Sequence, residues 1–461
     1  MRSIHQPSLP LVGIHQFGNR LGNVDDNVLL ATLLDLRGGS ATTAGLVSSA
    51  ASLTKNIMGI GVLTIAAGMA AGTGLAPATL AMALTTLAGA YSFALLGDSC
   101  ASAAVDATQC TFEHLWASTL GSGSVWVAHA AIGSLTFAIC AVYLICLGEL
   151  LPPLLTIFRA PRSLCTRRAA VMLAAAATFP LCLPKSLAGL EFSSYLGVAA
   201  IAYTALFSLW RCLDGSYTPT GRFHARMPPQ LRARFEPGAT WRVSRETAVL
   251  VANLGVALCA HFNAPSFYRG LRAASAPRFR AMTYLSFGLV FLLSLLITHP
   301  GYLTFGASCQ PLILSNYHPT DDWLATGARL ATAASLSCSF PLVFAALRES
   351  CLSALAPLLT RAPAATAAAA SAPLAAGGPA WWGATLLLPS LALALALGVD
   401  DLGLVVGLLG SILGGAIMCV PRLPTPPRRA ASPPPPLASL GLPRRVGASR
   451  PASALTAARV A

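Results

Sequence analysis

The chain has 461 residues, of which 55% are hydrophobic and only 10% charged, and its formal net charge is +14. Its mean hydropathy of +0.66 is too high for an ordinary soluble protein. Apolar runs recur along the chain, and they are long enough to cross a bilayer, which takes about 20 helical residues. We therefore expect an all-α polytopic membrane protein.

The positive charge comes almost entirely from arginine, since Lys55 and Lys185 are the only lysines. The arginines fall in expected loops and in the C-terminal tail, without the interleaved aromatics of a basic binding face. Membrane lipid is therefore an expected partner and nucleic acid is not. No CxxC pair occurs among the 12 cysteines, and neither a metal nor another cofactor is expected. The adjacent acids Asp321 and Asp322 are interpreted as helix-capping charge, so we do not expect an enzyme.

The chain divides into three parts by composition. Residues 1–44 are polar and interrupted by Pro and Gly, unlike a cleavable signal peptide, and are expected to form a polar tail. Residues 45–421 are expected to form the transmembrane core. Residues 422–461 are rich in Pro and Arg, which is typical of a disordered tail that is partly polyproline II.

Apolar periodicity predicts about ten (10–11) transmembrane helices in the core. The fourth and ninth are the shortest, and an Arg-rich connector separates the fifth from the sixth. A five-plus-five count predicts two structural repeats, with a discontinuous first helix in each. The expected spans are 46–68, 75–97, 125–151, 169–184, 190–210, 247–268, 282–304, 323–347, 382–398 and 402–420.

The first span contains the sequence SLTKNIMGIG, which places Lys55, Asn56 and two glycines inside an apolar stretch. A charge at membrane depth costs about 3 kcal/mol on insertion scales, so it indicates a cavity or a partner. The glycines at 59 and 61 weaken the helical hydrogen bonding, and irregular backbone in a bilayer is tolerated only where protein encloses it. We expect a broken helix and a binding site here.

The sixth span shows the same kind of interruption. It carries Asn253, His261, Asn263 and Pro265 within thirteen residues. So many polar groups and helix breakers do not suit a helix that faces lipid. We therefore expect a second broken helix opposite the first.

Six fragments in order resemble the amino acid/auxin permease family, closest to its branch of sodium-coupled neutral amino acid transporters. They include SLTKNIMGIGVLTI for the first helix, FAICAVYLICLGELLPPLL for the third, and CAHFNAPSFYRGL for the sixth. The resemblance covers residues 46–420. It implies a leucine-transporter-like fold with a 5+5 inverted repeat, in which an amino acid binds where helices 1 and 6 are broken.

The substrate site that the resemblance implies combines backbone and side chains. Free N–H groups of a half-helix suit a carboxylate, and unwound carbonyls suit an ammonium. Tyr143 and His261 have structural alternatives, since either side chain can simply hydrogen-bond a neighbouring helix, and a histidine also suits a proton-linked switch. The expected substrate-binding residues are Met58, Gly59, Ile60, Gly61, Tyr143 and His261.

The coupling ion stays open between H+ and Na+. In the family's fold a sodium ion lies between first-helix carbonyls and eighth-helix hydroxyls, and here Ser335 and Ser339 share one helical face. Several sodium-coupled relatives have asparagine where this chain has Lys55, whose ammonium can take the place of the ion and exchange a proton. Alternatively, Lys55 reaches an interface or pairs with Glu149.

These residues predict a secondary active transporter of amino acids, small neutral ones in particular, driven by a proton or sodium gradient. The alternative is a membrane amino acid sensor or scaffold that keeps the binding site without transport. The expected location is an integral, multi-pass position in the plasma membrane or a vacuolar or other endomembrane. The sequence names no protein partner.

Overall fold

The structure is a computed structural model that describes residues 44–102, 110–184, 192–235, 240–245, 247–360 and 377–399. Within these residues the chain is helical, with two isolated β-bridges and no strand. The predicted all-α fold is confirmed. Besides the broken spans described below, the main helices are α5 (Leu75–Ser102), α6 (Phe112–Leu120), α7 (Val125–Ile157), α8 (Arg167–Thr178), α9 (Phe192–Leu213), α12 (Ala276–Phe305), α13 (Trp323–Thr360) and α14 (Pro379–Gly398).

The first span is broken as predicted. Helix α3 (Leu46–Ile57) ends at Met58, whose backbone N–H donates to the Thr54 carbonyl, and Gly59 is extended. The chain then forms a 3₁₀ turn, η1 (Ile60–Thr64), and a short helix, α4 (Ile65–Ala70). The two halves are bent by 47° relative to each other. The break leaves the C-terminal end of one half-helix beside the N-terminal end of the next.

The sixth span is also broken as predicted. Helix α10 (Thr247–Ala257) is followed by the 3₁₀ turn η8 (His261–Asn263) and by α11 (Ala264–Gly270). Pro265 lies in the first turn of α11, where its missing N–H costs no intrahelical hydrogen bond. The breaks fall in the first span of each predicted half of the core, which is the pattern that two structural repeats require.

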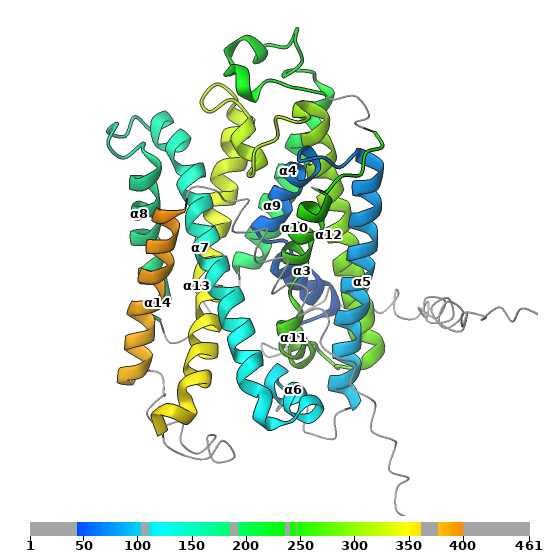
Figure 1. Cartoon of the computed structure of the whole chain (residues 1–461), viewed down its shortest axis with the longest axis vertical. Coiled ribbons are helices and arrows are strands. Elements are labelled where there is room, and N and C mark those ends of the chain that lie inside the picture. The colour runs from blue at the N-terminus through cyan, green and yellow to red at the C-terminus, as the bar shows by residue number, and fades with distance from the viewer. Residues whose placement is uncertain are drawn as a thin grey trace, which may run out of the picture. The chain divides into compact units, whose positions relative to one another are not determined.

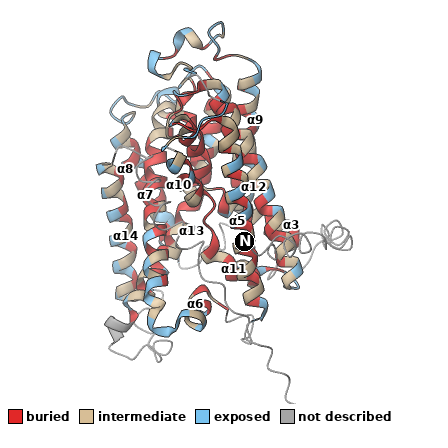
Figure 2. Cartoon of the chain, turned by 45° about the vertical axis from the view of Figure 1, so that its right-hand side comes forward, coloured by how far each residue is buried: buried red, intermediate tan, exposed pale blue. Residues whose placement is uncertain are grey.

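The long helices hold these two breaks between them. Helix α13 packs along α7, and α12 packs against α3, α5 and α9 (Figure 1). Helix α7 is largely buried, whereas α14 has much of its surface exposed (Figure 2). The exposed residues of α14 include Leu386, Leu387 and Leu391. Apolar surface of this kind suits contact with lipid, and the chain is an integral, multi-pass membrane protein.

The number of spans is lower within the described residues than the ten predicted. Seven helical segments are long and apolar enough to cross a membrane, and the bent pair at the first span makes eight. The fourth predicted span corresponds to α8, which has 12 residues and continues only into the short 3₁₀ turn η4 (Phe179–Cys182). The span predicted at 402–420 lies outside the described residues, so the count of ten stays a prediction.

Candidate functional site

A cavity of about 310 Å³ lies where the two broken spans meet α7 and α13. It is lined by residues from the end of α3, from both sides of the break in the sixth span, and from the middle of α7 and α13. The lining residues are Asn56, Ile57, Gly59, Gly61, Thr136, Ile139, Tyr143, Val256, Ala257, Cys259, Phe262, Asn263, Ser266, Phe267, Leu342, Val343 and Ala346. None of these side chains carries a charge.

The two predicted glycines differ in what surrounds them. A Cβ on Gly61 would lie 2.8 Å from the Cα of Ala257, so the two breaks touch backbone to backbone there. A Cβ on Gly59 would lie 3.6 Å from the hydroxyl oxygen of Tyr143, which is an ordinary contact distance. Gly61 is therefore required for packing, while Gly59 keeps space open in front of the Tyr143 hydroxyl.

The backbone at the breaks supplies polar groups to this cavity. The first N–H groups of a helix and its last carbonyls have no partner within the helix. Residues from the end of α3, from η1 and from the end of α10 line the cavity, and the Ile57 carbonyl there accepts from the Gly59 N–H at 2.8 Å. Across the cavity the amide of Asn263 donates to the Asn56 side-chain oxygen at 3.2 Å. This hydrogen bond joins the two broken spans.

The remaining predicted substrate residues lie in different places. Met58 is buried and faces a second, smaller cavity rather than the large one. Ile60 belongs to η1, and its side chain lies outside the described part of the structure. Tyr143 is buried on α7 and lines the large cavity, and within the described residues its hydroxyl makes no hydrogen bond. That leaves the Tyr143 hydroxyl available to a ligand.

His261 turns away from the large cavity. Its Nε2 is 2.7 Å from the Ser92 hydroxyl and 3.2 Å from the Gly89 carbonyl, both on α5. The ring also packs edge-on against Phe93. These contacts correspond to the helix-to-helix hydrogen bond that the sequence left open as an alternative, and a substrate role for His261 stays a prediction.

Lys55 connects the first span to α13. Its ammonium donates to the Ser339 hydroxyl at 2.6 Å, and the Ser339 hydroxyl donates to the Ser335 carbonyl at 2.7 Å. The alternative partner, Glu149, instead accepts a hydrogen bond from Ser315 at 3.2 Å. The structure therefore brings together the three residues predicted for ion coupling.

A small cavity of about 20 Å³ borders the Lys55 site. It is lined by Lys55, by the hydroxyl-bearing residues Thr204, Thr332 and Ser335, and by apolar residues such as Met58. Gly59 lines both the small and the large cavity. The backbone at residue 59 is thus the wall that the two cavities share.

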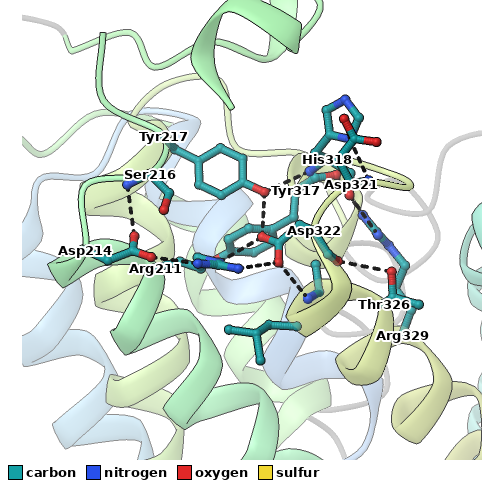
Figure 3. A network of polar contacts seen from close by, with 12 residues as sticks. Arg211, Asp214, Ser216, Tyr217, Tyr317, His318, Asp321, Asp322, Thr326 and Arg329 are labelled. Atoms are coloured by element: carbon teal, nitrogen blue, oxygen red, sulfur yellow. Dashed lines mark hydrogen bonds and ion pairs between the residues drawn. The ribbon is translucent and has the colours of Figure 1, made fainter. Parts of the chain in front are cut away.

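A buried cation, Arg211, lies at the junction of α9 and the start of α13. Arg211 donates to both carboxylate oxygens of Asp322, at 2.6 and 2.9 Å, and to Asp214 at 2.6 Å (Figure 3). Tyr217 also donates to Asp322, at 2.9 Å. The predicted capping role of Asp322 is present as well, since its Oδ1 accepts from the Ala325 N–H at 3.2 Å.

The same network fastens the loop that precedes α13. Arg329 donates to the backbone carbonyls of Leu314, Tyr317, His318 and Pro319 at 2.7–3.2 Å.

Burial alone would raise the pKa of Asp214, but hydrogen bonds from Ser216 and Arg211 outweigh it and hold that pKa below 3.8. Sequence reasoning missed this network, because Arg211 and Asp322 are far apart in the chain and only Asp322 carried a recognisable local signal.

The family model described as transmembrane amino acid transporter protein matches residues 42–420. Vacuolar amino acid transporter 7 of Saccharomyces cerevisiae is 25% identical over 309 residues, 66% of this chain and 59% of the yeast protein. Putative sodium-coupled neutral amino acid transporter 11 of Danio rerio is 30% identical over 167 residues, 36% of each chain. The chain therefore spans 59% or less of these curated relatives.

Among solved structures, the chain is similar to the crystal structure of MhsT in complex with L-phenylalanine. The TM-score is 0.46 with 16% sequence identity, and the match covers 82% of this chain and 89% of that one.

Proposed function

The chain belongs to the transmembrane amino acid transporter family, and from that premise we propose that it is a secondary active transporter of neutral amino acids. The observation that carries the proposal is the cavity of about 310 Å³ between the two helix breaks, whose lining side chains carry no charge. Small neutral substrates are part of this proposal. The runner-up is a membrane sensor that binds an amino acid and does not transport it.

The substrate's two charged ends find complementary groups at the breaks. The α-carboxylate is held by the N–H groups at the start of η1 and by the Tyr143 hydroxyl, and the α-ammonium by the carbonyl ends of α3 and α10. The side chain then points to the apolar wall formed by residues such as Ile139 and Val343. A charged side chain would lose its water there without a counter-charge, which disfavours acidic and basic substrates.

We assign the coupling ion as a proton carried by Lys55. Its ammonium already bridges α3 and α13 through Ser339, where the resemblance had suggested sodium. Two like charges in one small site repel each other strongly, so a sodium ion and a protonated Lys55 do not occupy it together. In this mechanism protonated Lys55 holds the two helices together, and proton release loosens them.

Purified protein in proteoliposomes tests the proposal directly. A pH step in sodium-free buffer should drive uptake of labelled neutral amino acids, and replacing sodium by choline should have no effect. Uptake that collapses in choline and ignores the pH step would assign coupling to sodium, with Ser335 and Ser339 as its ligands. Binding without counterflow would favour the sensor.

The helix break provides a matched pair of variants for the same assay. Gly61→Val should abolish uptake, because a Cβ there already lies 2.8 Å from the Ala257 backbone. Gly288→Val is the control, since Gly288 on α12 has no atom within 4 Å of an added Cβ. Normal uptake by membrane-inserted Gly61→Val protein would remove the substrate site from this break.

A further inference from the structure

The side chain of Lys55 lies directly over Gly197, which belongs to α9. A Cβ built on Gly197 would fall 2.0 Å from the Cε of Lys55, 2.1 Å from its Cδ and 3.1 Å from its Cγ. Helices α3 and α9 pack against each other, and Gly197 is buried. The space where residue 197 would have a side chain is therefore filled by the stem of the lysine.

The lysine has little freedom to move away while keeping its partner. Its Cα is fixed on α3 and its ammonium donates to Ser339 on α13 at 2.6 Å, so the stem spans the gap between these helices beside α9. An added methyl group would contact three successive carbons of that stem. Relieving the overlap requires the chain to leave this path, and the hydrogen bond to Ser339 goes with it.

Gly197 has no direct access to the substrate. It lines neither the large cavity nor the small one. The nearest atoms to an added Cβ all belong to Lys55. Any effect of residue 197 on coupling therefore acts through the lysine.

We propose that Gly197 is a positioning residue for Lys55, whose missing side chain forms the groove that lets the ammonium reach Ser339. The inference rests on the proposed function in one respect, namely that Lys55 carries the coupling proton. The contact itself does not depend on that role. It adds Gly197 to the residues of the fifth span, such as Thr204, that lie at the Lys55 site.

A double-mutant cycle between Gly197→Ala and Lys55→Ala tests the contact. Gly197→Ala should lower the thermal unfolding midpoint of otherwise wild-type protein in detergent. In the Lys55→Ala background the stem is gone, so the same change should have no cost or stabilise the helix slightly. If the Gly197→Ala variant does not fold, folding of the double variant would show that the Lys55 side chain causes the failure. Equal destabilisation in both backgrounds would overturn the proposal.

Transport measurements then test the positioning role. Gly197→Ala should reduce pH-driven accumulation about tenfold, the size expected for losing one hydrogen bond from a charged donor, and should shift the pH profile of uptake. Downhill exchange should continue. Gly288→Ala on α12 is the control and should leave both unchanged, since an added Cβ there meets no atom within 4 Å. A uniform loss of uptake at every pH, with an unmoved profile, would assign Gly197 to packing alone.

The two parts of the experiment separate two kinds of failure. If wild-type uptake proves to be sodium-driven, the proposed proton coupling fails, while the unfolding cycle still reports whether Gly197 seats Lys55. If uptake follows the pH step but Gly197→Ala leaves the profile and the unfolding midpoint unchanged, the positioning inference fails and the proposed function stands.

Discussion

The partly buried Lys55 and the buried Arg211 are held in opposite ways. Arg211 is 1% exposed and meets Asp322, which is fully buried, in a two-pronged ion pair supported by Asp214. Lys55 donates to one neutral hydroxyl and, within the described residues, meets no carboxylate. The carboxylates compensate the positive charge of Arg211, whereas a single hydroxyl compensates the charge of Lys55 only weakly. A site that must exchange its cation needs the second kind of surroundings.

The chemistry of the two side chains fits this division. A guanidinium stays protonated in proteins, and the carboxylates of Asp322 and Asp214 compensate the charge of Arg211. A lysine can release its proton when its surroundings favour the neutral form. The arginine network fastens α9, α13 and the loop between α12 and α13, whereas Lys55 lies beside the cavities. We infer that the first region is a fixed clamp and the second is the moving part.

The largest effect is expected from breaking the clamp. Asp322→Ala leaves Arg211 and Tyr217 buried without their shared acceptor, which should cost about 3–5 kcal/mol in the free energy of unfolding. We expect little folded protein, measured by thermal unfolding in detergent and by yield from membranes.

The neighbouring residue is the matched control for that prediction. Asp321 pairs with Arg226 at 2.8 Å, but these side chains are 40% and 63% exposed. Solvent-exposed ion pairs contribute little, so Asp321→Ala should leave the unfolding midpoint unchanged. Equal losses from the two variants would mean that the clamp is no more important than a surface pair.

The next effect concerns transport rather than stability. Lys55→Ala should abolish pH-driven accumulation while exchange down a gradient persists, because the group that takes up the proton is gone. Lys55→Asn, which replaces the ammonium by an uncharged amide, should shift the dependence toward sodium. Both are measured as uptake in proteoliposomes under separate pH and sodium gradients. Full pH-driven accumulation in Lys55→Ala would return this lysine to a structural role.

A smaller effect is expected at the hydroxyl partner. Ser339→Ala removes the acceptor of the Lys55 ammonium, and we expect a loss of pH-driven uptake of a few-fold, since water can replace one hydroxyl. Ser337→Ala is the control, because the Ser337 hydroxyl donates to the Ala333 carbonyl of its own helix. If uptake were instead sodium-driven, Ser335→Ala and Ser339→Ala should raise the sodium concentration for half-maximal uptake. Identical uptake in the Ser337 and Ser339 variants would contradict the proposed bridge.

The smallest effect is a pH dependence of stability. The pKa of Asp214 is lower in the folded protein than its ordinary 3.8, so its contribution is fully present above that value and is lost as the pH falls through the folded pKa. Between pH 8 and 5 the contribution of Asp214 should therefore stay constant while uptake changes. The unfolding midpoint of wild type and Asp214→Asn across this range checks it. A difference between the two midpoints that shrinks already near pH 6 would contradict the assignment.

Much of the fold followed from local sequence features. Glycines at 59 and 61 and Pro265 have conformational effects that act within a few residues, so both helix breaks were predicted at the right places. Span lengths were less certain. Alanine-rich α8 has 12 residues and ends at Thr178, two residues before Pro180, where the chain continues as the 3₁₀ turn η4.

The site was predictable where it depended on residue type and position along one helix. Lys55 was named because a charge is unusual in an apolar span, whereas Ser335 and Ser339 were named because the family resemblance implies ion-binding hydroxyls on the eighth helix and these two share one face. The direction in which His261 turns depends on α5, and the partner of Arg211 lies 111 residues away. Gly197 offered no signal at all, since a glycine in a span becomes informative only when its neighbour is known.

In the proposed mechanism the coupling cation is the side chain of Lys55, which is covalently part of the protein, and that has an electrical consequence. A dissolved ion is left on the far side of the membrane after each cycle, but a lysine returns with its protein. Moving one elementary charge fully across the membrane costs or yields about 2.3 kcal/mol per 100 mV. If Lys55 keeps its proton, the charge that moves with it in one direction moves back when the protein returns. A net movement of charge therefore requires that the proton leaves the lysine. Membrane voltage should then act on the carrier's current only through the protonation state of this one side chain.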